Sequence, residues 1–164
     1  MKISKIFLAV VALFAVACTN NNSDGNEGGV TDTTKWIEEG SVIGDWKLTH
    51  WANKEESALQ VYLSFNEDGS FDLYQRIYSV VWLHYEGTFT LENNTLSGVY
   101  SDGEPWKKSY SVSYAEETPT RIRLIDQSDS ADISIYTEGA IPSEIIDEAQ
   151  PAVNVRSVAL DRFL

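Results

Sequence analysis

The chain has 164 residues, a length that suits one domain, and its 25 acidic against 12 basic residues give a formal net charge of −13. So acidic a surface repels polyanions, which argues against binding of nucleic acid or of an anionic lipid surface. The single cysteine, Cys18, excludes an internal disulfide bond and a thiolate metal site. Packing must therefore stabilise the fold.

Residues 1–17 have the pattern of a bacterial signal peptide, with a basic start and an apolar run over 6–16 that is too short to span a bilayer. The run ends in Ala-Val-Ala followed by Cys18, which resembles the lipobox of bacterial lipoproteins. The resemblance implies that Cys18 is lipidated with acyl chains such as palmitate. It also implies an outer-membrane location, facing the periplasm or the cell surface. The alternative is an ordinary cleaved signal followed by a free cysteine.

Residues 18–34 are rich in Asn, Gly, Ser, Asp and Thr and contain one large apolar residue, Val30. Such a segment cannot bury enough apolar surface to offset the entropy of ordering. We therefore expect a disordered tether that begins at lipidated Cys18. Residues 35–164 are expected to form one domain that includes a C-terminal helix and tail.

Eight segments of this domain alternate apolar and polar residues with the period of a half-buried strand. The first begins at Gly44, and the others cover 59–65, 70–77, 82–91, 95–101, 107–115, 121–126 and 132–137. The first strand places Trp46, Leu48 and His50 on one face. The phase is unclear over 78–81, where we predict a break rather than one continuous bent strand.

Turn-forming residues separate neighbouring segments, as at Asn93-Asn94, where two residues tolerate positive φ. Consecutive strands joined by hairpins form an up-and-down meander, and eight strands can close on themselves. The sequence thus predicts an all-β fold, an eight-stranded antiparallel up-and-down barrel. After Pro142, Ile145 lies on an apolar stripe that predicts a short C-terminal helix. Residues 152–164 are too apolar for a free tail and should pack back or pair with an edge.

Several motifs are similar to those of lipocalin-like proteins. Gly44-x-Trp46 resembles the lipocalin signature, and the motifs spread over 87–112, with Ile-Pro-Ser-Glu at 141–144, resemble those of lipocalin-like lipoproteins from gut-type Gram-negative bacteria. The resemblance implies a barrel in which Trp46 packs across the closed end, usually against a late arginine. Three arginines lie outside the position that this role needs: Arg121, Arg123 and Arg156.

Candidate ligand-binding residues combine aromatic rings with a few polar groups, and alternation places them on strand faces that would line a barrel mouth: Tyr74, Arg76, Tyr78, Trp82, His84, Trp106, Tyr110 and Tyr114. Such a wall suits a small apolar or amphipathic molecule, with Arg76 anchoring a carboxylate. The alternative is a barrel filled by its own aromatic side chains, with Arg76 in solvent, acting as a protein-interaction or structural accessory of an envelope complex.

The sequence lacks the signatures of common catalytic and metal sites. His50 and His84 are the only histidines, and neither belongs to a His-x-His or His-Glu-x-x-His motif. The acidic residues at 126–132 lack the glycine and the ligand spacing of a calcium loop. We therefore expect no enzymatic activity, no metal and no cofactor. Hydrolysis or saccharide binding through Trp82 or Trp106 is the weakest alternative.

Overall fold

The computed structural model describes residues 33–52, 54, 60–77, 79–116, 120–152 and 162–164, which all belong to the compact unit Thr33–Leu164. Four expectations lie outside the described residues: the signal peptide, the lipidation site at Cys18, the tether up to residue 32, and any role of Tyr78 or Arg156. In the part of the chain that is described, no helix has the length and apolar character that a membrane span requires.

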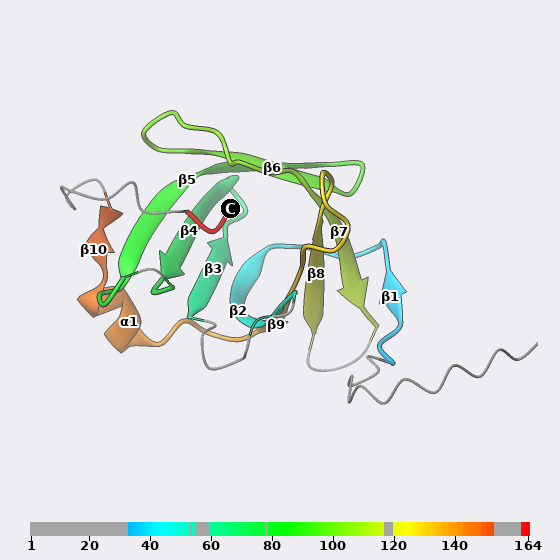
Figure 1. Ribbon diagram of the computed structural model, residues 1–164, viewed down its shortest axis with the longest axis horizontal. Helices are drawn as coiled ribbons and strands as arrows, with labels where there is room; N and C mark the ends of the chain where they lie inside the picture. Colours follow the sequence, from blue (N-terminus) through cyan, green and yellow to red (C-terminus); the bar gives the residue numbers. More distant parts are fainter. Residues whose placement is uncertain (1–32, 53, 55–59, 78, 117–119, 153–161) are drawn as a thin grey trace, which may run out of the picture. The chain divides into compact units, whose positions relative to one another are not determined.

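Eight strands close into an antiparallel barrel (Figure 1). They are β2 (Gly44–Trp51), β3 (Val61–Phe65), β4 (Ser70–Gln75), β5 (Leu83–Glu92), β6 (Thr95–Tyr100), β7 (Tyr110–Ala115), β8 (Arg121–Asp126) and β9 (Ile133–Glu138). Each strand pairs with the next along the chain, and β9 returns to pair with β2, so that Trp46 lies opposite Glu138. The predicted up-and-down barrel is confirmed.

Two short strands lie outside this ring and were not predicted. β1 (Trp36–Ile37) pairs antiparallel with the end of β7, and β10 (Gln150–Pro151) pairs parallel with the start of β5. Both have two residues, too few to show an alternation in the sequence. β10 pairs with the part of β5, and β1 with the part of β7, that lies beyond the pairing of these strands with β6.

The turns follow their residue types. Asn93 and Asn94 adopt φ values of 50° and 59° between β5 and β6, the left-handed conformation that a tight hairpin requires. Gly69, with φ at 82°, closes the turn between β3 and β4. β4 ends at Gln75 and β5 begins at Leu83, so the predicted break between them is confirmed.

One strand face was predicted wrongly. Trp46 and Leu48 of β2 are buried as expected, but His50 is exposed. The pairing of β2 with β9 shifts register between Leu48 and His50, as at a β-bulge. The shift reverses the alternation, so that Trp51 rather than His50 packs against the core.

The helix α1 (Ser143–Glu148) lies against the outside of the barrel, beside β10 (Figure 1). Pro142 precedes it, and Ile145 is buried against Tyr74 and Trp82. Ile141 and Ala149 pack on the same cluster. The predicted apolar stripe is therefore the face that covers the barrel's flank.

Candidate functional site

The barrel interior is lined with aromatic rings that meet edge to face. Phe71 lies 5.1 Å from Trp106 and 5.6 Å from Tyr100, measured between ring centroids, and Trp106 lies 6.4 Å from Tyr110. Gly98 of β6 leaves room for Trp106, because a Cβ atom there would lie 2.5 Å from the indole Cε2. The interior is thus apolar and closely packed around these rings.

The structure separates the predicted ligand-binding residues into two groups. Trp106, Tyr110 and Tyr114 belong to the interior core and are at most 6% exposed. Tyr74 and Trp82 belong to a second cluster with Ile145 of α1, on the outer face.

Arg76 and His84 accompany the second group. The Arg76 guanidinium lies 4.9 Å from the Trp82 ring centroid, and its Nε donates a hydrogen bond to Gln60 Oε1. The His84 ring stacks on Tyr74. The predicted residues therefore do not form one wall: three face inward and four face outward, because a β-strand turns alternate side chains to opposite faces.

Three buried polar atoms of the interior have no hydrogen-bond partner among the described residues: Trp106 Nε1, Tyr114 Oη and Tyr136 Oη. Ser134 lies near Tyr136, but the geometry falls short of a hydrogen bond. A buried donor without a partner costs about 1–3 kcal/mol. These atoms are therefore available to a molecule that carries hydrogen-bond acceptors.

Interior tyrosines remain protonated at neutral pH. Burial raises the pKa of Tyr136 well above its ordinary value, and burial likewise raises the pKa of Tyr110 and of Tyr100. The Asp132 carboxylate adds to the rise of the Tyr110 pKa, and the Tyr110 hydroxyl adds to the rise of the Tyr136 pKa. Each hydroxyl can therefore donate a hydrogen bond within the barrel.

The last residues of the sequence enter the barrel. Leu164 is 1% exposed within the core, and the C-terminal segment lies inside the ring of strands in Figure 1. Its carbonyl oxygen accepts a hydrogen bond of 3.0 Å from Tyr100 Oη. We call Arg162, Phe163 and Leu164 the C-terminal tip. The expectation that the tail packs back is confirmed for the tip, and residues 153–161 lie outside the described part.

The tip enters at the end of the barrel where β2 and β4 finish, which we call the mouth. Phe163 lies 4.9 Å from the Trp51 ring centroid, edge to face, and its backbone N–H donates to Gln75 Oε1 at 2.9 Å. Arg162 lies 4.3 Å from the Tyr100 ring centroid and pairs with Asp102. Aromatic, amide and ionic contacts thus hold the tip in the mouth.

A polar cluster borders the mouth. Lys108 Nζ lies 3.2 Å from Asp126 Oδ2 and also pairs with Asp132. Trp51 Nε1 donates to Asp132 Oδ1 at 2.9 Å. Asp126 is 3% exposed and also accepts hydrogen bonds from the N–H and Oγ of Ser128. The cluster ties the segment before β7 and the end of β2 to the loop between β8 and β9.

The opposite end is closed around Trp46, which is 2% exposed and donates from Nε1 to the Val42 carbonyl at 2.7 Å. Arg121 and Arg123 stack instead on Trp36 of β1, with ring-centroid distances of 5.6 and 4.6 Å. Arg121 and Arg123 therefore contact Trp36 of β1, while Arg156 lies outside the described residues.

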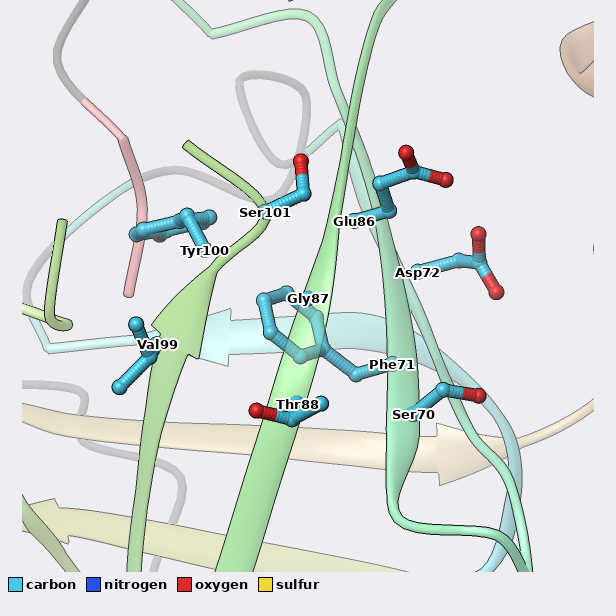
Figure 2. A pocket seen from close by; sticks show the side chains of 9 residues that line it. All are labelled: Ser70, Phe71, Asp72, Glu86, Gly87, Thr88, Val99, Tyr100 and Ser101. Carbon is cyan, nitrogen blue, oxygen red and sulfur yellow. The ribbon is translucent and has the colours of Figure 1, made fainter. Parts of the chain in front are cut away.

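The outer faces of β4, β5 and β6 border an open pocket of about 530 Å³ (Figure 2). Most of its lining residues occupy outward positions and carry oxygen atoms: Ser70, Asp72, Glu86, Thr88 and Ser101. Phe71, Gly87, Val99 and Tyr100 complete the lining. The pocket is polar where the carboxylates of Asp72 and Glu86 lie side by side in Figure 2.

One histidine and two carboxylates converge beside this pocket. The nearest ligand atoms of Asp72, His84 and Glu86 all lie within 4.8 Å of one another, and His84 Nε2 lies 2.7 Å from Asp72 Oδ1. The sequence interpretation grouped His84 with aromatic residues and named no carboxylate beside it. The signal that was missed is the strand alternation, which places residues 72 and 74 on the outer face of β4 and residues 84 and 86 on the outer face of β5. The register of the β4–β5 pair brings these residues together.

Residues 42–118 match the family model of the lipocalin-like domain. The matched segment runs from Val42, which binds the Trp46 indole, past the end of β7. It confirms, over these residues, the resemblance inferred from the sequence. No curated protein matches the chain.

Proposed function

We propose that the protein binds a small apolar or amphipathic molecule in its closed eight-stranded barrel, because residues 42–118 of that barrel match the lipocalin-like family model. The observation that carries this proposal is the C-terminal tip in the mouth. It occupies the barrel with an apolar side chain, Leu164, and a hydrogen-bonded carbonyl group.

The tip indicates what kind of ligand fits. Leu164 fills an apolar space, while Tyr100 Oη binds an oxygen acceptor beside it. A ligand with an apolar body and an oxygen-bearing head would make the same contacts after displacing the tip. Binding then requires that the contacts of the tip break. The apparent association constant is therefore the intrinsic one multiplied by the fraction of molecules in which the mouth is open.

The buried atoms without partners support the same chemistry. Trp106 Nε1 and Tyr136 Oη are donors in the interior, and a ligand oxygen would satisfy them. An aliphatic ligand without polar atoms would leave them unpaired. We therefore expect amphipathic molecules to bind more tightly than alkanes of the same length.

The cellular location of the protein is also part of this proposal. The small residues before Cys18 support lipidation, and multiple acyl chains at about 0.8 kcal/mol per buried methylene would hold the chain permanently on a membrane. We place it on the outer membrane, as a binding protein without enzymatic activity. Its contact with the membrane is through the lipid anchor, and nucleic acid is not a partner.

A second candidate function is that of a filled barrel, an accessory of an envelope complex. The observation that favours it is the close packing of the interior, where the largest residues include Trp46, Phe65 and Tyr136, each at most 2% exposed. In that case the tip is a permanent part of the core, and ligands have no space to enter.

A fluorescent amphipathic probe separates the two functions. We expect 11-(dansylamino)undecanoic acid to bind the purified chain with increased emission, and dodecanoate to displace it. Phe163→Ala removes the ring that packs on Trp51 and should strengthen probe binding at least threefold. Ile146→Ala, on the exposed side of α1, serves as the control and should leave binding unchanged.

Absence of saturable binding by both the native chain and Phe163→Ala would contradict a ligand carrier and would favour the accessory function. Equal affinities of the native chain and Phe163→Ala would place the probe elsewhere than in the mouth.

A further inference from the structure

The register of β4 and β5 brings three metal-ligating side chains to one spot on the outer face. Asp72 lies directly opposite Glu86, and Tyr74 lies opposite His84. Residues two apart on a strand share a face, so Asp72, Glu86 and His84 all project outward. From this geometry we propose that Asp72, His84 and Glu86 bind a divalent transition-metal ion of the zinc class.

The distances suit such an ion. Zinc lies about 2.0–2.2 Å from nitrogen and oxygen ligands, which places tetrahedral ligand atoms roughly 3.4 Å from one another. His84 Nε2 and Asp72 Oδ1 lie 2.7 Å apart, and all three ligand atoms lie within 4.8 Å of one another. These two values bracket the separation that tetrahedral coordination requires.

The charges also favour a cation. Two carboxylates directly opposite each other in an antiparallel pair repel, which destabilises the pairing. A divalent ion between Asp72 and Glu86 converts this repulsion into attraction. The side chains of His84 and Asp72 are 24% and 31% exposed, so solvent screens the site only in part.

Neighbouring groups orient the ligands. The Tyr74 ring stacks on His84 with 4.6 Å between centroids and 12° between planes, which fixes the plane of the imidazole. Asn66 Nδ2 donates to Asp72 Oδ2 at 3.5 Å and restrains the carboxylate from its other side. Such contacts behind the ligands are typical of metal sites, where they hold the ligand orientation.

One coordination position remains for a molecule from solvent. Asp72 and Glu86 line the open pocket of about 530 Å³, together with the hydroxyl groups of Ser70 and Thr88 (Figure 2). Three protein ligands and an open fourth position are the arrangement of zinc sites that bind water or an anion. One imidazole and two carboxylates suit zinc, nickel or cobalt better than the all-oxygen shell of magnesium or calcium.

Calorimetric titration with zinc chloride tests this site, using the full chain produced without a histidine tag and stripped with a chelator. We expect one zinc ion per chain. His84→Ala should weaken zinc binding at least tenfold. His50→Ala, which removes the exposed histidine of β2, is the matched control and should leave binding unchanged.

Glu86→Gln is a second variant that should not disturb folding, because the Glu86 side chain is exposed and glutamine has nearly the same shape. It should also weaken zinc binding at least tenfold, and the cobalt-loaded native chain should show visible absorption bands that Glu86→Gln loses. Equal zinc affinity of the native chain, His84→Ala and Glu86→Gln would overturn the site. So would a native chain that binds no zinc, since Asp72 and His84 would then form a hydrogen-bonded pair alone.

Discussion

Gly87 lies in β5 where the barrel wall offers no room for a side chain. A Cβ atom there would lie 2.1 Å from the Val99 carbonyl oxygen and 2.7 Å from Phe71 Cε1. The carbonyl belongs to the backbone of β6, which can move only if the strand pairing moves with it. The close approach of β5 and β6 therefore requires a glycine, which has no side chain, at position 87.

Gly87→Ala should destabilise the fold by roughly 1–3 kcal/mol, the usual cost of overpacking a core. Urea unfolding followed by fluorescence measures this change. The matched control is Gly139→Ala, because no atom of the described residues lies within 4 Å of a Cβ atom at Gly139. Equal stabilities of the two variants would show that β6 moves aside without cost.

Asp126 is a charged residue buried at the edge of the mouth. Burial by itself would raise the pKa of its carboxyl group, but hydrogen bonds from Ser128 and the Lys108 ammonium outweigh burial and lower that pKa below its ordinary value. The ionised form therefore stabilises the fold above the unfolded-state pKa of about 3.9. This contribution is lost as pH falls through the lower folded-state pKa.

Asp126→Asn should lower the free energy of unfolding at pH 7 by about 1–3 kcal/mol, because a charged acceptor of hydrogen bonds is removed. The difference from the native chain should shrink as pH falls through the lowered folded-state pKa of Asp126, because the native carboxyl then also becomes protonated. Denaturant titrations at several pH values measure it. Asp147→Asn, on exposed helix surface, is the control. A deficit that stays constant from pH 7 to pH 2 would contradict the assigned cause.

The C-terminal tip is the element that determines whether the mouth is open. Its contacts differ in kind: Arg162 stacks on Tyr100, Phe163 packs on Trp51, and Leu164 is buried. An exposed cation–π contact contributes about 0.5–1 kcal/mol, so the contact of Arg162 with Tyr100 can break without unfolding the barrel.

Arg162→Ala should therefore open the tip more often. Hydrogen exchange at the Phe163 amide, which donates to Gln75 Oε1, reports this opening. We expect exchange to accelerate roughly threefold or more, as the loss of one such contact implies. Glu104→Gln, in the same loop as Asp102, is the control and should leave the rate unchanged. An unchanged rate in Arg162→Ala would mean that the other contacts hold the tip alone.

At the scale of the whole molecule, the strand order and closure could be predicted from alternation and turn residues. Eight half-buried segments with hairpin signals leave few other arrangements, and Asn93-Asn94 adopts the positive φ values that its residue types favour. The bulge beyond Leu48 could not be predicted, because nothing in the residue pattern marks a register shift. His50 was placed on the wrong face for this reason.

The candidate sites were less predictable than the fold. Alternation within a strand predicts which residues share a face, but the burial of Tyr74 on the outer face depends on its covering by α1, more than sixty residues later in the chain. The insertion of Leu164 and the convergence of Asp72 with His84 likewise join segments whose contact only the tertiary structure determines.

The central claim is that an amphipathic ligand replaces the C-terminal tip in the mouth, and nuclear magnetic resonance of the Leu164 methyl groups tests it most directly. In the free protein these methyl signals should be shifted by the rings around the buried side chain. We predict that saturation with dodecanoate moves them to positions typical of exposed leucine, while the ligand chain shows contacts to the Trp51 and Tyr100 rings. Leu164 signals that stay unchanged at saturation would contradict the account.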